Sequence, residues 1–416
     1  MPEAVVRQAL SRSRALRNLT VILHKLAFPL PPFERFYRDH MRRLLDLVAE
    51  TNPLDEQGRA FNQRMRPQRQ AQPRGPLTWA WVLPDVTGPG SGGHRTVFRM
   101  TNHLLQRGHR VRLHINLESY TRSVEEMRAY IASHYGDAPG LELHLSTRDL
   151  ADSDILVATG WETAYTVFQQ PNTRFKVYLV QDFEPWFQPM NALALFAENT
   201  YRMNLFGCCS SPWLDQLTRG YGMTGMQFHY GYDEKDYFAD ASVARDPNLV
   251  AVYLRPMTGR RGYELVSLAL ARLKQQRPQT RIVVFGNTEP IPHLSFAAEQ
   301  VGSLKDAALA DLFRRAAVVM VASLTNYSII PVEAMACGAL VVDVDRPSVS
   351  SMFKHGEELL LAPVHVPGLA DTLQSALDDD ALRRRVTTTA AARLDRYRWP
   401  DILAGVERDL LDAYFR

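Results

Sequence analysis

The sequence has little cysteine and no long hydrophobic run. Its 416 residues include three cysteines, two of them adjacent, which do not suit a disulfide framework or a metal site of standard spacing. Its longest apolar stretches, at 316–323 and 339–342, are strand-sized and far shorter than the roughly 18 residues of a membrane span. The N-terminus shows no pattern of a secretory signal peptide. We therefore expect a reduced, cytoplasmic protein, with Cys208 and Cys209 as small buried apolar residues.

The body of the chain also lacks basic charge. The net charge is +3, but residues 1–70 hold thirteen Lys or Arg and seven Asp or Glu, so the remainder carries −3. A nucleic-acid-binding body needs a dense basic face, and we do not expect that class of protein. The composition, 46% apolar and 22% charged residues, is typical of a globular enzyme, and the length suggests about two or three domains.

Residues 1–75 are expected to form a basic helical extension and a linker. Apolar residues recur at near-helical spacing, PLPP at 29–32 divides them into two helices, and 63–76 is polar and contains proline. One interpretation is a solvated helical segment that packs on the body. The other is a basic amphipathic segment that rests on an anionic membrane face or on a partner protein.

From residue 77, short apolar runs alternate with amphipathic stretches. This alternation predicts parallel sheets with helices on both faces. A polar segment at 231–248 divides the pattern, so we expect an α/β protein with two Rossmann-like domains, at 76–242 and 243–398, and a last helix at 399–416. Ligands of such sheets bind beyond the carboxyl ends of the strands, here in the cleft between the domains. The expected strands lie at 77–83, 110–116, 154–160, 176–182, 205–211, 249–255, 281–286, 317–323 and 339–344.

A glycine-rich turn at 84–95 follows the first expected strand. Gly92 and Gly93 let a ligand approach the backbone, and their N–H groups begin the next helix, which favours an anion or a polar sugar. The spacing is not GxGxxG, so the turn carries no dinucleotide fingerprint. A tight strand–helix turn without a ligand is the alternative.

Arginines mark the turn after the strand at 249–255. Arg255, Arg260 and Arg261 lie within seven residues at the carboxyl end of that strand. Their forked guanidinium groups suit a diphosphate, and the alternative is a set of surface arginines.

A third polar turn precedes a helix that Pro331 opens and Gly338 closes. Glu333 lies in the first turn of this helix, where it either complements the helix dipole or accepts the hydroxyls of a ribose. The turn itself offers N–H groups and side chains to phosphate and sugar from Thr325, Asn326, Tyr327 and Ser328.

These motifs resemble the donor domain of retaining family 4 glycosyltransferases of GT-B fold. EAMACG (333–338) with ALVV matches the family's signature helix, and RPMTGRRG (255–262) resembles its diphosphate-binding turn. The segment 229–238 is similar to the inter-domain segment, 301–323 with Gly302 to the stretch that holds the nucleobase, and 396–415 to the helix that crosses back. The resemblance covers about residues 77–416. It implies two facing Rossmann-like domains with a cleft between them.

The segment 181–204 resembles bacterial rhamnosyltransferases of surface-polysaccharide synthesis, such as that of S-layer glycan or O-antigen. The resemblance implies dTDP-β-L-rhamnose as donor, a rhamnose-containing glycan as acceptor, retention of configuration and no metal or other cofactor. Three alternatives stay open. They are a family 4 enzyme using GDP-mannose or UDP-glucose, a sugar-nucleotide epimerase, and a catalytically inactive adaptor of a polysaccharide-assembly complex.

Two positions depart from the family's pattern. Thr325 stands where the first of two glutamates is usual, and Gln181 stands where a histidine usually precedes the aspartate, here Asp182. That histidine usually contacts the 6-hydroxyl of the sugar. Rhamnose has no 6-hydroxyl, which makes Gln181 understandable.

The resemblance also implies roles for individual residues. Arg255 and Arg261 would stabilise the leaving diphosphate, and Asp182 would orient or partly deprotonate the acceptor hydroxyl. Aromatic side chains in the cleft, among them Phe183 and Phe187, either stack on sugars or belong to the core. The residues expected to bind the acceptor are His94, Trp161, Glu162, Gln181, Glu184 and Trp186.

Overall fold

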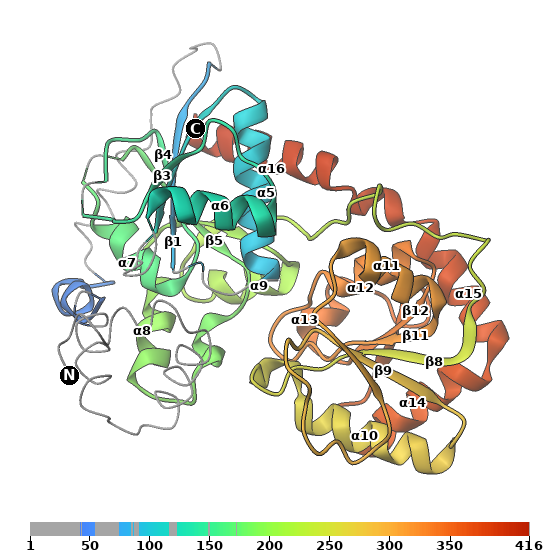
Figure 1. The fold of residues 1–416 in the computed structure, drawn as a ribbon. Coiled ribbons are helices and arrows are strands. Elements are labelled where there is room, and N and C mark those ends of the chain that lie inside the picture. The colour runs from blue at the N-terminus through green and yellow to red at the C-terminus, as the bar shows by residue number, and fades with distance from the viewer. Residues whose placement is uncertain are drawn as a thin grey trace, which may run out of the picture.

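The computed structural model describes residues 42, 44–54, 75–84, 86, 91–115, 123–148, 150–171 and 173–415. These residues form two α/β domains, each built on one parallel sheet (Figure 1). The expected α/β class with two Rossmann-like domains is confirmed. Most of the predicted N-terminal extension, namely residues 1–41 and 55–74, lies outside the described residues.

The N-terminal domain contains a seven-stranded parallel sheet of order β3-β2-β1-β4-β5-β6-β7. Its central strands are mostly apolar and almost entirely buried because helices cover both faces. The strand order reverses between β1 and β4, and the carboxyl ends of these two strands are the usual place for a ligand. The strands are β1 Thr78–Leu83, β2 Arg110–Ile115, β3 Glu142–His144, β4 Ile155–Ala158, β5 Phe175–Val180, β6 Phe206–Cys209 and β7 Thr224–Gln227.

Helices follow most of these strands. Their apolar residues are buried and their polar faces are open, as expected for amphipathic helices on a sheet. The helical elements are α5 Gly92–Gln106, α6 Val124–Tyr135, α7 Trp161–Gln169, the 3-10 turn η1 Glu184–Phe187, α8 Ala192–Thr200 and α9 Pro212–Arg219.

The C-terminal domain contains a six-stranded parallel sheet of order β10-β9-β8-β11-β12-β13. The order reverses between β8 and β11, so the turns after these two strands occupy the second ligand-binding position. The strands are β8 Asp246–Tyr253, β9 Arg281–Phe285, β10 Glu299–Gly302, β11 Ala316–Met320, β12 Leu340–Val344 and β13 Leu360–Ala362. The helical elements are η2 Gly259–Arg261, α10 Tyr263–Gln276, α11 Asp306–Arg315, α12 Ile330–Ala336, α13 Pro347–Ser350, α14 Val366–Asp378, α15 Asp380–Ala391, η3 Leu394–Tyr397 and α16 Trp399–Tyr414.

Helix α16 leaves the C-terminal domain and lies against the N-terminal domain (Figure 1). The Glu407 carboxylate is 2.7 Å from His103 Nε2 and 3.2 Å from His109 Nε2. Near its end, the Tyr414 hydroxyl donates to the Asp154 carboxylate at 3.2 Å. These contacts fix the two domains to each other.

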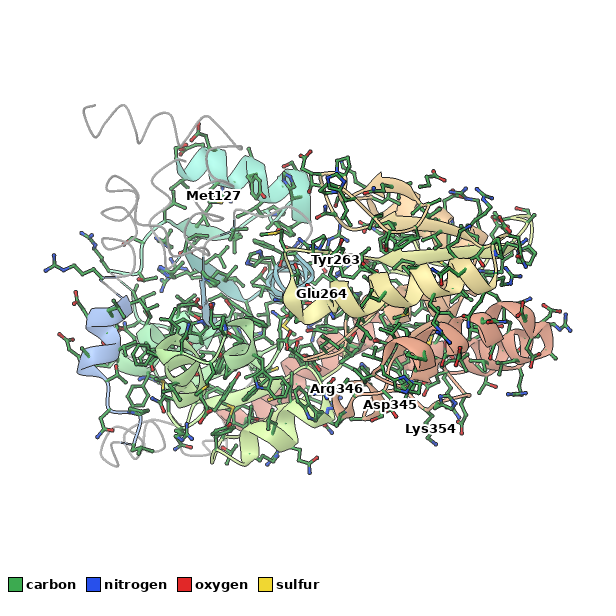
Figure 2. All side chains as sticks on the ribbon, turned by 90° about the horizontal axis from the view of Figure 1, so that it is seen from below. Met127, Tyr263, Glu264, Asp345, Arg346 and Lys354 are labelled. Carbon is green, nitrogen blue, oxygen red and sulfur yellow. The ribbon has the colours of Figure 1, made fainter. Side chains whose placement is uncertain are left out.

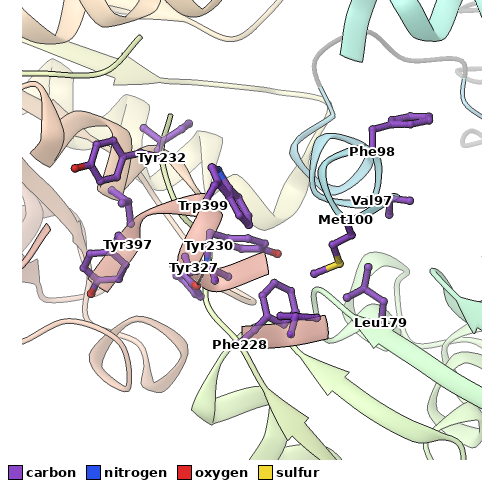
Figure 3. Close-up of a cluster of buried hydrophobic side chains, with 14 of the residues drawn as sticks. Val97, Phe98, Met100, Leu179, Phe228, Tyr230, Tyr232, Tyr327, Tyr397 and Trp399 are labelled. Atoms are coloured by element: carbon purple, nitrogen blue, oxygen red, sulfur yellow. Dashed lines mark hydrogen bonds between the residues drawn. The ribbon is translucent and has the colours of Figure 1, made fainter. Parts of the chain in front are cut away.

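A shared hydrophobic cluster also joins the domains. Figure 3 shows Tyr230, Tyr327 and Trp399 between the helix that carries Met100 and the elements of the C-terminal domain. The rings of Tyr230 and Tyr327 lie 5.0 Å apart, and the Tyr327 hydroxyl accepts a hydrogen bond from the Tyr230 backbone N–H at 2.7 Å. The two domains therefore meet over a buried aromatic cluster.

The described part of the N-terminal extension packs on α7. Residues 44–50 are helical, and Leu44 is 5% exposed within an N-terminal-domain core cluster. The Gln169 side chain donates to the Leu47 carbonyl and to the Thr51 hydroxyl, at 3.3 and 2.7 Å. None of the described helices is long and apolar enough to cross a membrane.

Candidate active site

Turns at the carboxyl ends of the two sheets meet each other. Asn326, after β11, donates from its side-chain nitrogen to the Gln181 carbonyl at 2.9 Å, after β5. The Asn326 side-chain oxygen accepts from the Ser211 hydroxyl at 3.0 Å. A Cβ built on Gly92 would lie 4.0 Å from Ile329 of the other domain. The polar turns predicted from the sequence thus face each other across one interface.

An ion pair across this interface joins two of the predicted residues. Arg260 Nε lies 3.4 Å from Asp182 Oδ2, and the Arg260 guanidinium lies 4.3 Å above the Phe187 ring. Burial raises the pKa of Asp182, and the charges of Arg260 and Arg261 oppose this rise. Burial also lowers the pKa of Arg260, against the attraction of Asp182. A cation of the C-terminal domain therefore sits against a carboxylate of the N-terminal domain.

The other two arginines of this turn complete a cationic group. Arg261 donates to the Ser323 hydroxyl at 3.4 Å, and Arg255 donates to the Tyr253 hydroxyl at 3.2 Å. The charges of both lower the pKa of Arg260 further, which shows that the three guanidinium groups are near one another. Such a group of forked cations suits a diphosphate.

The backbone supports this cationic turn. Gly262 has a left-handed φ of +57, which favours glycine, and a Cβ there would make only ordinary contact, at 3.4 Å, with Ala322 and Leu324. Figure 2 shows Tyr263 and Glu264 at the beginning of α10, at the end that points toward the N-terminal domain. The free N–H groups of this helix end add positive potential to that of the arginines.

The first turn of α5 forms the opposite wall. Gln181 donates to the Gly93 carbonyl at 3.2 Å, and a Cβ on Gly93 would lie 3.3 Å from the Gln181 amide nitrogen. The Gln181 Oε1 atom and the His94 Nδ1 atom are buried without a hydrogen-bond partner in the part of the chain that the structure describes. Burial lowers the pKa of His94 to about 4. This histidine is therefore neutral at pH 7.

Two carboxyl groups lie close together beside Asp182. Glu184 accepts from the Trp161 backbone N–H at 2.7 Å and from the Tyr178 hydroxyl at 3.0 Å. A Cβ on Gly160 would lie 3.3 Å from Glu162 Oε2 and 3.7 Å from Glu184 Oε2. Burial raises the pKa of Glu162 to about 7. Burial, together with the charge of Glu162, raises the pKa of Glu184 to about 8.

The predicted acceptor aromatics differ in exposure. Trp161 is 4% exposed, and its ring packs edge-on against Tyr165 within the core. Trp186 is 48% exposed. Of these two tryptophans, Trp186 is the one that a ligand can reach.

Glu333 lies at a different part of the interface from the arginine turn. It is 3% exposed, and burial raises its pKa to about 7, against the charges of Arg99 and Arg95 on α5. Arg95 pairs with Asp306 of the C-terminal domain, and Arg99 pairs with Asp233 of the inter-domain segment. The sequence reasoning missed Arg95 and Arg99, although their i, i+4 spacing puts them on one face of α5.

The remaining predicted donor residues spread along the same edge of the C-terminal sheet. Ser328 and Thr325 are 7% and 5% exposed. Tyr327 is part of the buried aromatic cluster between the domains. Gly302 ends β10, two strands away from β8, with φ +75. The structure thus brings the arginine turn, Asn326, Gln181 and Asp182 together, and places Gly302 further along.

Among the described residues, no group of three or more His, Cys, Asp or Glu side chains is placed so that it could hold a metal ion.

The C-terminal domain is similar to a known protein family. Residues 234–393 match the family described as "Glycosyl transferases group 1". Over 346 residues the chain is 30% identical to the O-antigen biosynthesis protein RfbC of Myxococcus xanthus, a match that covers 81% of this chain. It is 28% identical over 166 residues to a phosphatidyl-myo-inositol mannosyltransferase of Mycobacterium tuberculosis, covering 36% of this chain. The chain spans 27% of the first relative and 43% of the second.

Solved structures share the fold. The Anabaena protein HepE in complex with UDP-glucose has a TM-score of 0.63 at 15% identity, over 81% of this chain and 100% of that one. Sucrose-phosphate synthase from Thermosynechococcus elongatus has a TM-score of 0.60 at 17% identity, over 81% of this chain and 99% of that one. The chain therefore has the two-domain GT-B fold, and residues 234–393, most of its C-terminal domain, are similar to the group 1 glycosyltransferases.

Proposed function

We propose that this protein is a retaining glycosyltransferase of bacterial surface-polysaccharide synthesis. It transfers L-rhamnose from dTDP-β-L-rhamnose to a rhamnose-containing glycan. The observation that carries the proposal is the group of three arginines at the point of strand reversal, opposite Asp182. Similarity to the O-antigen biosynthesis protein of Myxococcus xanthus supports O-antigen synthesis, and the UDP-glucose complex of HepE supports a nucleotide sugar as donor class.

The arginine turn would stabilise the leaving group. As the bond from the sugar to the diphosphate breaks, negative charge develops on the phosphate oxygens. Arg255 and Arg261, with the N–H groups at the start of α10, offer fixed positive charge at this place without a metal ion. Since these groups are already held by Tyr253 and Ser323, little reorganisation is needed during the reaction.

Asp182 would hold the acceptor hydroxyl. Its Oδ1 atom accepts from the Phe183 backbone N–H at 2.9 Å, so the carboxylate is fixed. Burial makes it a stronger base than an ordinary aspartate because its pKa is raised. The acceptor oxygen would attack from the same face that the diphosphate leaves, which retains the configuration.

Rhamnose is proposed on the basis of Gln181. Its side chain is bonded to the Gly93 carbonyl, and the neighbouring wall carries the neutral His94. An amide at this position fits a sugar without a 6-hydroxyl. A family 4 enzyme that uses UDP-glucose or GDP-mannose is the second candidate. It is favoured by the likeness to HepE, solved with UDP-glucose, and to the phosphatidyl-myo-inositol mannosyltransferases.

The site of action is proposed to be the cytoplasm, including the inner face of the plasma membrane. The basic N-terminal extension would contact an anionic membrane or an assembly partner there. Helix 44–50 would then carry the extension on the N-terminal domain.

A thermal-shift ranking tests the donor. Thymidine, uridine, guanosine and adenosine diphosphates are added to the full chain, and a ligand that binds the folded state raises its apparent stability by RT ln(1 + [L]/Kd). We expect thymidine diphosphate to give the largest shift and dTDP-β-L-rhamnose to be consumed fastest. Faster use of a hexose donor with a 6-hydroxyl would contradict the rhamnose proposal. Tight binding of thymidine diphosphate without transfer to any glycan would indicate an inactive adaptor.

A further inference from the structure

Two tryptophans form an open aromatic surface beside the candidate active site. Trp186 on η1 and Trp213 on α9 have ring centroids 5.9 Å apart and ring planes at 37°. Trp186 is 48% exposed, and Trp213 is half-buried. Exposed tryptophans that gather in one place mark a binding surface more often than single exposed apolar residues do.

Buried rings hold this surface in place from below. Phe183, 4% exposed, lies 4.9 Å from the Trp186 ring and 6.5 Å from the Trp213 ring. Phe183 in turn stacks on the fully buried Tyr201 at 5.6 Å. The Tyr201 hydroxyl lies between backbone groups of the same segment, accepting from Glu184 N–H at 3.2 Å and donating to the Asp182 carbonyl at 3.4 Å. The tryptophans are therefore rigidly tied to the segment that begins with Asp182.

The position of the surface connects it with the reacting groups. Phe187, the next residue after Trp186, lies under the Arg260 guanidinium. Arg260 also contacts Asp182, so the proposed donor cations and the proposed base meet directly beside η1. The Phe187 ring is occupied by this cation, whereas the Trp186 ring is open.

We propose that Trp186 and Trp213 form the subsite for the terminal sugar of the acceptor, a neutral pyranoside that presents an apolar C–H face. A 6-deoxyhexose fits best, because its methyl group extends that face. The proposal rests on the proposed function and adds the recognition of the acceptor. Aromatic rings offer a large apolar surface at low entropic cost, and the edges of the sugar remain free for polar groups.

The chemistry of the surroundings favours a sugar over a lipid or protein surface. The exposed rings are few, aromatic and backed by a rigid stack. Two rings match the face of one pyranose, whereas a stable protein interface buries about 800 Å² on each partner.

Binding of a simple glycoside tests the subsite without any need for turnover. Methyl α-L-rhamnopyranoside is titrated into the full chain, with and without thymidine diphosphate, and followed by saturation-transfer NMR and calorimetry. We expect millimolar binding, with transfer to the ring C–H groups and to the methyl group. Trp186→Ala and Trp213→Ala should each weaken binding by about tenfold, and Trp186→Phe should retain most of it.

The matched control is Met190→Ala. Met190 is apolar and 79% exposed a few residues away but offers no aromatic ring to a sugar, so its removal should leave glycoside binding unchanged. The thermal shift with thymidine diphosphate should be equal in all variants, which shows that they are folded and that the donor site is intact. Equal glycoside binding by wild type and Trp186→Ala would overturn the proposal.

Three further outcomes are informative. Absence of glycoside binding to the wild type at 50 mM (roughly 1.8 kcal/mol in the affinity scale) would also overturn the subsite, as would loss of phospholipid-vesicle binding in Trp186→Ala. A protein that binds the glycoside but none of the four nucleoside diphosphates would retain the subsite and refute the proposed donor function. The two proposals therefore fail independently.

Discussion

Replacement of Arg260 by glutamine tests the contact between the two domains at the proposed reacting centre. At the 3.4 Å separation of Arg260 Nε and Asp182 Oδ2, Coulomb's law gives a gross attraction of about 5 kcal/mol at an effective dielectric constant of about 20. Desolvation offsets much of this value, since both side chains are largely removed from water. Loss of one fixed donor at a developing anion costs about 10²–10³ in turnover, and we expect that loss in Arg260→Gln.

The pH dependence of Arg260→Gln tests whether the Asp182 carboxylate acts in the reaction. Burial raises the pKa of Asp182, and Arg260 is the largest influence that lowers it. Removing the cation therefore raises the pKa of Asp182 further. If the deprotonated carboxylate acts in the reaction, the acidic limb of the kcat/KM profile must move to higher pH.

The assay is release of thymidine diphosphate from dTDP-β-L-rhamnose in the presence of acceptor, between pH 5 and pH 9. Arg281→Gln is the matched control. Arg281 is 61% exposed, and its guanidinium lies 2.6 Å from the Asp246 carboxylate, away from the interface between the domains. It should leave rate and profile unchanged. An acidic limb that stays in place or moves to lower pH in Arg260→Gln would refute the role of this ion pair.

Three further substitutions test the scaffold by urea unfolding. Gly262→Ala should lower the free energy of unfolding by about 1–2 kcal/mol because of the left-handed φ of +57, whereas Gly259→Ala, with nothing within 4 Å of its Cβ, should change it little. Leu44→Ala should lower the free energy of unfolding by about 2–5 kcal/mol, because the buried Leu44 side chain holds the helix at 44–50 on the N-terminal domain. Leu45→Ala, at 44% exposure, should lower it much less, and equal losses would contradict this packing. Burial raises the pKa of Glu407, but hydrogen bonds from two histidines hold it below its ordinary value overall. The wild type should therefore exceed Glu407→Gln in stability at pH 7 and lose this advantage as the pH falls below about 4.5, the ordinary value; a constant difference would contradict the linkage.

The sequence predicted the architecture well because the central strands are continuous apolar runs. The strands β1, β4, β9 and β12 each lie inside an expected run, and β5 and β8 overlap theirs but begin one and three residues earlier. It did not reveal short outer strands, such as β3 Glu142–His144 and β7 Thr224–Gln227. These have three or four residues and contain polar or exposed positions, so they lack the apolar signal on which the prediction depends.

The candidate site was predictable as far as local clusters go. Arg260 and Asp182 each follow a strand, and the rule for parallel sheets puts such residues at the interface. Their pairing with each other depends on how two domains are oriented, which no local pattern encodes. The same reason explains why the ion pair of Arg95 with Asp306 was missed. The contact of Trp213 with Trp186 was also missed, because the two rings come from different elements, α9 and η1, that only the folded domain brings together.

The central claim is that the arginine turn binds the diphosphate of the donor against the N-terminal domain. A crystal structure of the full chain with thymidine diphosphate tests it most directly. The account predicts phosphate oxygens within hydrogen-bonding distance of the guanidinium groups of Arg255 and Arg261 and of the N–H groups at the start of α10. A nucleotide bound elsewhere, with this turn making no phosphate contact, would contradict it.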